Sequence, residues 1–262
     1  MEKTKNALRF VLFTYMVTWL LWLPAIVQSL SGKEISQMNF VIGVFGLMVP
    51  SVMGLIFLLK ESKLKDVLRD LFKFSMNKWM AVVFVLLPLV MVIAHATNVL
   101  IFGASWPVIE EAYKIPLQFV SVLVLGGPLI EEIGWRGYLQ NKLNQRYSPI
   151  AAGLIVGVIW AIWHFPLFLI KEMLHGGMPL SQFTITVILM SMVISVFQAK
   201  ANSGIWPALI FHTYMNVTMD VTPLFNEKGH TLWAIVNGVL LVVVIGIGIL
   251  YDKKKQLPDA SS

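Results

Sequence analysis

The sequence predicts an all-α, polytopic membrane protein with about eight transmembrane helices around an intramembrane polar cavity. Of its 262 residues, 57% are hydrophobic and 13% are charged, whereas a soluble domain carries about 25% charged residues. Apolar runs of about 20 residues, long enough to cross a bilayer as a helix, recur along most of the chain. We therefore interpret residues 1–262 as a single integral membrane domain.

Eight apolar runs account for most of the chain. The first follows a basic N-terminal segment and is longer than the apolar part of a typical signal peptide, so it is interpreted as a transmembrane helix. The predicted spans cover residues 10–30, 39–59, 79–102, 116–140, 149–170, 181–199, 204–222 and 231–251. The fourth, fifth and seventh spans contain the polar motifs that carry the functional prediction.

The segment 60–78 between the second and third spans is basic and amphipathic. Its apolar residues Leu64, Val67, Leu68, Leu71 and Phe72 follow helical spacing among lysines. Such a segment is typical of a helix that lies in the membrane interface, and we expect it at the cytoplasmic surface.

The distribution of basic residues predicts the orientation of the chain in the cell membrane. If the N-terminus is inside, sixteen of the 20 lysines and arginines fall in the inside segments. Cytoplasmic loops carry an excess of these residues, so both termini are expected in the cytoplasm. The net charge of +6 is thus assigned to topology and the lipid bilayer, and no nucleic-acid partner is expected.

The strongest functional signal is the run Glu131-Glu132-Ile133-Gly134-Trp135-Arg136 in the fourth span. Ionisable residues in a bilayer are costly unless paired or hydrated, and they are usually functional. In a helix, Glu132 and Arg136 share a face at i,i+4 spacing, whereas Glu131 is displaced by about 100°. We expect Arg136 to neutralise Glu132 and to leave Glu131 free as a general base. An ion pair that merely fastens the helix is the alternative, and it leaves Glu131 unexplained.

Two further polar pairs occur at the same helical spacing, Trp160 with His164 in the fifth span and His212 with Asn216 in the seventh. Taken singly, each pair also fits ordinary hydrogen bonding between helices, at roughly 0.6–2 kcal/mol per bond. Together with Glu131 they could line one wet cavity, in which Glu131 and a histidine deprotonate water. His212 and Asn216 could then donate hydrogen bonds to an oxyanion, at about 3–4 kcal/mol per donor.

The order EExxxR, aromatic-xxx-His and HxxxN resembles the CAAX protease and bacteriocin-processing family. This family contains the type II CAAX prenyl endopeptidases, which are also called intramembrane glutamic endopeptidases. The resemblance covers about residues 115–222, the expected motif-bearing catalytic core. The matching residues are Glu131, Glu132, Arg136, His164, His212 and Asn216. The family's usual second motif is Phe-xxx-His, and Trp160 takes the aromatic position here.

The resemblance implies an intramembrane endopeptidase that cleaves a peptide bond near the cytoplasmic membrane face without a cofactor. By this resemblance Glu131 and His164 activate water, and His212 with Asn216 forms the oxyanion site. The best-known substrate is the C-terminal tripeptide of a prenylated Cys-a-a-X protein, so a peptide or protein substrate, prenylated or membrane-embedded, is expected. Family members are also linked to bacteriocin self-immunity and to processing of small secreted peptides.

Three alternatives remain open from the sequence. A zinc-dependent membrane metalloprotease would use Glu131, His164 and His212 as ligands, although no HExxH is present. A non-proteolytic bacteriocin-immunity or partner-binding scaffold would keep the motif residues without cutting. A transporter also places polar groups at mid-membrane, but it predicts two related halves, and the sequence shows no such repeat.

Overall fold

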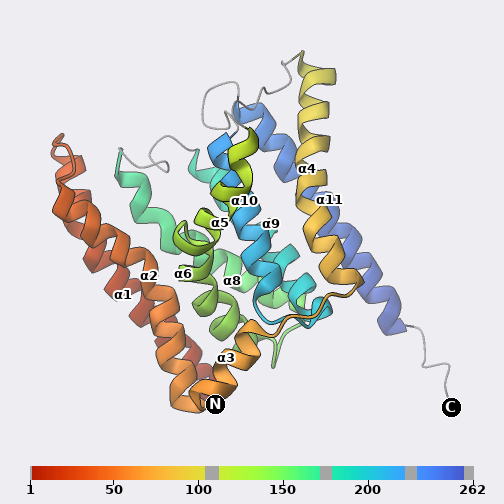
Figure 1. Cartoon of the computed structure of the whole chain (residues 1–262), viewed down its shortest axis with the longest axis horizontal. Helices are drawn as coiled ribbons and strands as arrows, with labels where there is room; N and C mark the ends of the chain where they lie inside the picture. Colours follow the sequence, from red (N-terminus) through yellow and green to blue (C-terminus); the bar gives the residue numbers. More distant parts are fainter. Residues whose placement is uncertain (1, 104–111, 172–178, 222–228, 257–262) are drawn as a thin grey trace.

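The computed structural model describes residues 2–103, 112–171, 179–221 and 229–256, and every regular element within these ranges is helical (Figure 1). This confirms the predicted all-α class. The helices before the polar motifs are α1 (Glu2–Leu30), α2 (Gln37–Glu61), α3 (Leu64–Phe72), α4 (Lys78–Phe102), the short η1 (Ala112–Lys114) and α5 (Ile115–Leu125). They are followed by α6 (Pro128–Glu132), η2 (Ile133–Gln140), α7 (Asn141–Leu143), α8 (Pro149–His164), η3 (Phe165–Leu169), α9 (Leu180–Ala201), α10 (Trp206–Val221) and α11 (Gly229–Gln256).

The lengths and hydropathy of the helices support the interpretation as a multi-pass membrane protein. Six stretches among the described residues are long and apolar enough to cross a bilayer: Lys5–Leu30, Gln37–Glu61, Lys78–Phe102, Ile115–Leu143, Pro149–Leu169 and Leu180–Ala201. They coincide with the first six predicted spans. A shorter apolar stretch, Thr231–Gly246, lies in the predicted eighth span. The predicted seventh span forms α10, whose 16 residues reach about 24 Å, so the expectation of about eight spans is approximately met.

The arrangement is that of two splayed arms around a packed centre (Figure 1). Helices α1 and α2 lie side by side in one arm, and α4 lies against α11 in the other. Between them sit α5, α6, α8, α9 and α10, with α8 packed along α9. The residues Ala208, Leu209, Ile210 and Phe211 of α10 are buried, so protein rather than lipid covers much of this short helix.

Glycines allow α2 to approach the helix that carries the first polar motif. A Cβ atom on Gly134 would lie 2.1 Å from the carbonyl oxygen of Pro50, and one on Gly54 would lie 2.6 Å from the Cα of Gly134. Both distances are too short for any side chain, so the backbones of α2 and η2 touch. Pro50 lacks the N–H group that would bond to the carbonyl of Gly46, four residues before it in α2. The hydroxyl of Thr18 donates to this carbonyl instead, at 3.3 Å.

The amphipathic segment forms the helix α3, and its apolar face packs partly on the protein. Val67 and Leu71 are buried against Leu209 of α10 and Ile205, the residue that precedes this helix. The amide of Ile205 donates to the carbonyl of Leu71 at 2.9 Å. Leu64, on the same segment, remains exposed.

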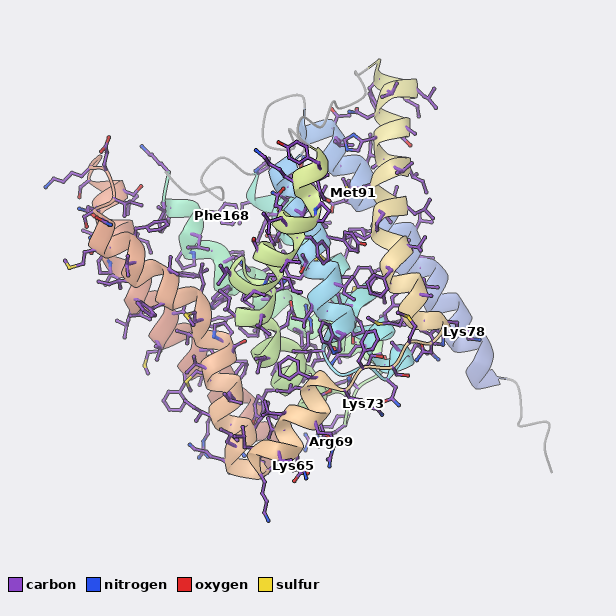
Figure 2. The ribbon with its side chains drawn as sticks, in the orientation of Figure 1. Lys65, Arg69, Lys73, Lys78, Met91 and Phe168 are labelled. Carbon is purple, nitrogen blue, oxygen red and sulfur yellow. The ribbon has the colours of Figure 1, made fainter. Side chains whose placement is uncertain are left out.

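Basic side chains of this segment line one end of the molecule. Figure 2 shows Lys65, Arg69, Lys73 and Lys78 along the edge where α3 lies, with Phe168 toward the opposite end. The beginning of α1, the end of α2 and the end of α11 are also found toward this edge in Figure 1. The α1–α2 pair and the basic segment therefore share one boundary of the apolar region.

Candidate active site

The fourth predicted span is interrupted directly before the glutamates. Helix α5 ends at Leu125, Gly127 adopts φ +118°, and α6 begins at Pro128. The predicted span 116–140 is therefore present but is not one continuous helix, because it is interrupted at Gly126–Gly127. A positive φ is open to glycine, and proline is tolerated in the first turn of the helix that follows. From Ile133 to Gln140 the chain then runs as a π-helix, a form that is frequent at functional sites.

Glu132 and Arg136 form the ion pair that their spacing predicts. The Nε atom of Arg136 lies 3.1 Å from Oε2 of Glu132, and both side chains have 0% exposure. The guanidinium carbon also lies 5.1 Å from the centre of the Trp160 ring. Arg136 thus neutralises one of the two adjacent carboxylates and stacks on the aromatic residue of the second motif.

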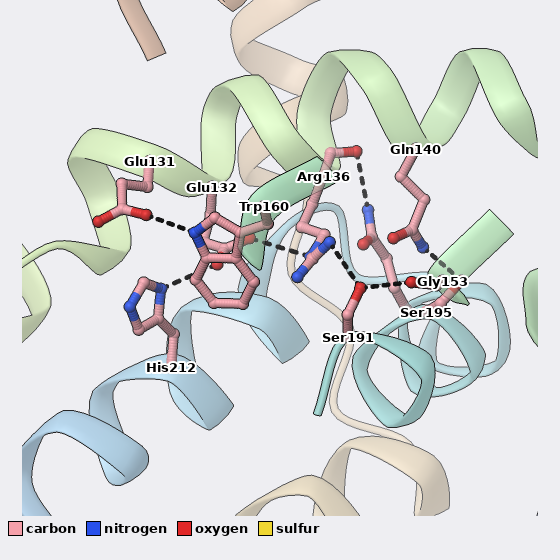
Figure 3. A network of polar contacts seen from close by, with 10 residues as sticks. Glu131, Glu132, Arg136, Gln140, Gly153, Trp160, Ser191, Ser195 and His212 are labelled. Atoms are coloured by element: carbon pink, nitrogen blue, oxygen red, sulfur yellow. Dashed lines mark hydrogen bonds and ion pairs between the residues drawn. The ribbon is translucent and has the colours of Figure 1, made fainter. Parts of the chain in front are cut away.

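Glu132 also reaches the third motif. Its Oε1 atom lies 2.8 Å from Nδ1 of His212 on α10, as Figure 3 shows. Because an ionised carboxylate only accepts hydrogen bonds, the proton of this bond belongs to Nδ1. Glu132 therefore bridges Arg136 and His212, and it orients the imidazole with Nε2 on the far side of the ring. This contact joins residues 80 positions apart, and the helical spacing gave no indication of it.

Glu131 has a different partner. Its Oε2 atom accepts a hydrogen bond of 2.8 Å from Nε1 of Trp160 on α8 (Figure 3). The side chain is buried, with 4% exposure. An indole N–H is an uncharged donor, so this bond orients the carboxylate without supplying a countercharge. The two adjacent glutamates consequently differ in environment, in the way that the sequence predicted.

Three polar atoms converge on Gly127 at the break. A Cβ atom at Gly127 would lie 3.2 Å from Oε1 of Glu131 and 3.3 Å from Nδ2 of Asn216. The same point lies 3.5 Å from Nε2 of His212. The Asn216 amide also donates at 2.8 Å to the carbonyl of Gly126, which fixes its position. The missing side chain of Gly127 thus leaves room beside a carboxylate, an amide and an imidazole nitrogen.

His164 joins the site through the Trp160 ring. The ring centres of Trp160 and His164 are 5.8 Å apart. The ring centres of Trp160 and His212 are 5.0 Å apart, so the Trp160 ring contacts both histidines. The Nδ1 atom of His164 lies 2.9 Å from the carbonyl oxygen of Trp160. A carbonyl only accepts, so Nδ1 carries the proton and Nε2 of a neutral His164 has a lone pair.

Buried polar side chains of α9 hold Arg136 and its neighbour Gln140 (Figure 3). Its Nη1 atom donates to Oγ of Ser191 at 3.2 Å, and Ser191 donates to the carbonyl of Gly153 at 2.6 Å. One turn further along, Gln140 donates to Ser195 at 2.7 Å. Sequence reasoning missed these polar side chains and Gly127. The signals were present as small residues at i,i+4 spacing in two adjacent spans, and as Gly126-Gly127-Pro128 before the glutamates.

The arrangement can perform acid–base chemistry on a bound carbonyl compound. Glu131 presents its Oε1 atom, and Asn216 presents an amide donor at the same point. Among the described residues, no group of three or more histidine, aspartate or glutamate side chains is close enough to hold a metal ion.

The fold and the site define the class of the protein: a multi-pass helical membrane protein with a polar constellation of buried Glu131, Glu132, Arg136, His164 and His212 and the half-buried Asn216. The family model described as Type II CAAX prenyl endopeptidase Rce1-like matches residues 113–218. This segment contains all seven residues that were predicted to form the site. The chain therefore resembles the type II CAAX prenyl endopeptidases, as the order of its motifs predicted.

Two curated proteins are similar to this chain. It is 29% identical over 267 residues to CAAX prenyl protease 2 of Methanococcus maripaludis, and the alignment covers 95% of both chains. It is 27% identical over 131 residues to Lysostaphin resistance protein A of Staphylococcus haemolyticus, which covers 49% of this chain and 34% of that protein. CAAX processing and a protease family are thus supported by the comparisons, and the link to bacteriocin immunity is a looser one.

Proposed function

We propose that the protein is an intramembrane endopeptidase in which Glu131 and His164 activate the water that attacks a peptide carbonyl. The observation that carries this proposal is the convergence of Glu131 Oε1, Asn216 Nδ2 and His212 Nε2 on the space beside Gly127. A hydrolytic site needs a base and oxyanion donors around one reacting atom. These three atoms supply that combination.

In the proposed reaction, the water oxygen bonds to the peptide carbonyl carbon while its proton passes to Glu131. Nε2 of His164, with the lone pair described above, assists in holding this water. The carbonyl π electrons move to oxygen and give a tetrahedral oxyanion. When the intermediate collapses, the C–N bond breaks and the leaving amine takes the proton back from Glu131, so the base becomes the acid.

The oxyanion would be held by Asn216 and His212. The Asn216 amide is a donor as it stands, whereas His212 already uses Nδ1–H toward Glu132. Its Nε2 therefore donates when the ring is an imidazolium. A buried imidazolium needs an opposite charge nearby, and Glu132 lies 2.8 Å away. We infer that Glu132 acts on the reaction by holding the His212 ring with Nε2 directed toward the oxyanion.

Trp160 would keep Glu131 in its reactive orientation. Its N–H occupies Oε2 and leaves Oε1 directed toward the space beside Gly127. The family position usually holds phenylalanine, which offers no such donor. Trp160 is therefore proposed as a positioning residue.

The substrate class proposed is the prenylated C-terminal Cys-a-a-X tripeptide, or a membrane-embedded peptide of similar chemistry. The name of the Methanococcus maripaludis relative, CAAX prenyl protease 2, supports this choice. A lipid-modified peptide partitions into the bilayer, where the buried glutamates lie. We also propose that both chain termini and the basic segment face the cytoplasm, which would place the cut near the cytoplasmic face.

The proposal is tested with purified protein in detergent, a farnesylated Cys-a-a-X peptide and the same peptide without the lipid. Wild type is expected to release the tripeptide from the farnesylated peptide. Glu131→Gln is nearly isosteric and should lower kcat by at least about 10²-fold with unchanged thermal unfolding. Equal cleavage by the variant contradicts the assigned base, and no cleavage of any peptide by wild type favours a non-proteolytic scaffold.

Chelation separates this proposal from the zinc alternative. Activity is expected to survive exhaustive treatment with 1,10-phenanthroline, because the proposed base and oxyanion donors are protein groups. Loss of activity on chelation, with recovery on adding zinc, would replace the mechanism with metal-assisted hydrolysis.

A further inference from the structure

A basic groove lies at the paired ends of α1 and α2, away from the glutamates. It has a volume of about 420 Å³ and is lined by Asn6, Arg9, Phe13, Phe57, Lys60 and Glu61. The groove combines two cationic side chains and an amide with two aromatic rings. Such a combination suits a ligand with an anionic head and an apolar body.

The groove carries an uncompensated positive charge. Its one acidic residue, Glu61, is already in an ion pair with Lys142 of α7. Within the described part of the chain, Arg9 and Lys60 form no ion pair with an acidic side chain. The ammonium group of Lys60 instead lies 5.4 Å from the centre of the Phe57 ring. Two basic groups are therefore available to an external anion.

The groove lies at the ends of two apolar stretches that are long enough to cross a bilayer. Arg9 lies near the start of the apolar stretch Lys5–Leu30, and Lys60 lies at the end of Gln37–Glu61. The beginning of α1 and the end of α2 lie toward the same edge of the molecule as α3 (Figure 1). Further into the apolar stretches, Leu12 and Ile56 are exposed, so hydrocarbon chains of a lipid would lie along the same two helices.

We propose that the basic groove binds the phosphate headgroup of an anionic phospholipid of the phosphatidylglycerol type. Arg9 and Lys60 contact the phosphate, Asn6 contacts the glycerol, and the acyl chains follow the exposed apolar faces of α1 and α2. Clusters of basic residues at the membrane boundary attract anionic lipids. A groove lined on two sides by α1 and α2 adds a fixed position for a single lipid.

The bound lipid would reinforce the support of the active site. Phe57 packs on Phe10 and Tyr138 with ring-centre distances of 6.1 Å and 5.3 Å. Phe10 in turn contacts Trp135, the neighbour of Arg136 in η2, at 5.8 Å. A headgroup that ties α1 to α2 therefore stabilises the aromatic cluster against which η2 is packed.

The proposal is tested by native mass spectrometry and thermal unfolding of the full chain in detergent. Dioleoylphosphatidylglycerol is titrated against dioleoylphosphatidylcholine. Wild type is expected to retain one phosphatidylglycerol preferentially and to unfold at a higher temperature with it. The double variant Arg9→Gln/Lys60→Gln should weaken the preference on the order of 30-fold, since each basic contact contributes about a factor of 5. The single variants should each lose part of the preference.

Lys63→Gln/Lys65→Gln is the matched control, because it removes the same charge from exposed positions that do not line the groove. This control should keep the single retained lipid. An equal loss in the control shows attraction by general surface charge and overturns the groove as a site. Equal retention of phosphatidylcholine by wild type overturns the requirement for an anionic head. Displacement of the lipid by millimolar inorganic phosphate assigns the groove to free anions and also contradicts the proposal.

Discussion

The indole nitrogen of Trp160 donates a hydrogen bond to Glu131 at 2.8 Å, so the second motif directly holds a carboxylate of the first. The neighbouring Trp163 is also buried, but its indole nitrogen has no hydrogen-bond partner among the described residues. Trp160 and Trp163 are thus both buried indole rings of α8, but only the N–H group of Trp160 donates a hydrogen bond among the described residues.

Trp160→Phe is expected to lower kcat while leaving the chain folded. Hydrogen bonds to charged groups contribute about 1.5–3 kcal/mol, which corresponds to a loss on the order of 10-fold or more. The lost donor held the carboxylate in its reactive orientation, so kcat should fall while KM changes little. Steady-state kinetics with the farnesylated peptide measure both constants. Trp163→Phe is the control, and a loss of kcat of the same size in both variants would contradict a specific role for the Trp160 N–H.

Glu132→Gln is expected to reduce both stability and activity. The change leaves the buried Arg136 without its countercharge and removes the carboxylate beside His212. Removing one partner of a buried pair costs about 3–5 kcal/mol. Thermal unfolding in detergent should show a clear decrease for Glu132→Gln and little change for Glu131→Gln. If the two variants unfold alike, the division of roles between the glutamates is wrong.

Ser191→Ala is expected to destabilise the chain and to lower activity through Arg136. The variant leaves a buried guanidinium nitrogen without its acceptor, at a cost of about 1–3 kcal/mol. Ser195→Ala is the matched control one turn along α9, because it removes a bond to Gln140 that does not reach the glutamates. It should lower the unfolding temperature without changing kcat. Equal effects on kcat would assign both serines to helix packing.

Gly127→Ala is expected to abolish activity. A methyl group there would lie 3.2 Å from Glu131 and would fill the space shared with Asn216. The backbone at φ +118° adds strain of about 1–3 kcal/mol. Gly103→Ala also replaces a positive-φ glycine, at +65°, but its Cβ would meet nothing within 4 Å. Peptide cleavage by both variants, with unfolding as a reference, separates backbone strain from a blocked site.

The orientation can be tested with introduced cysteines, because the chain has none of its own. Ser31→Cys lies between α1 and α2, and Ser62→Cys follows the end of α2; both positions are exposed. With both termini in the cytoplasm, a membrane-impermeant maleimide should label Ser31→Cys in intact cells. Ser62→Cys should react after the membrane is opened. The reverse labelling pattern would invert the proposed topology.

Much of the fold could be predicted from hydropathy, because a bilayer requires long apolar helices whose limits can be counted. The pairing of Glu132 with Arg136 was predictable for a similar reason, since helical spacing brings them to one face. The interruption at Gly127 was not predicted, because hydropathy is averaged over a window of residues. The residues on both sides of the break are apolar, so the average does not change there.

Contacts between helices that are distant in the sequence could not be predicted from residue spacing. The pairing of Glu132 with His212 and the hydrogen bond from Trp160 to Glu131 depend on how α6, α8 and α10 rotate against one another. Periodicity assigns residues to a face of a helix but does not say which neighbour that face meets. The sequence therefore predicted which residues gather, while their partners came from the structure.

The backbone contact between Gly134 and Pro50 has a consequence for biosynthesis. The surface that receives η2 belongs to α2, which leaves the ribosome first because synthesis proceeds from the N-terminus. When Gly134 enters the membrane, the first two helices have already been made and can serve as its template. The helix α2, on which η2 packs, is thus synthesised before η2 itself.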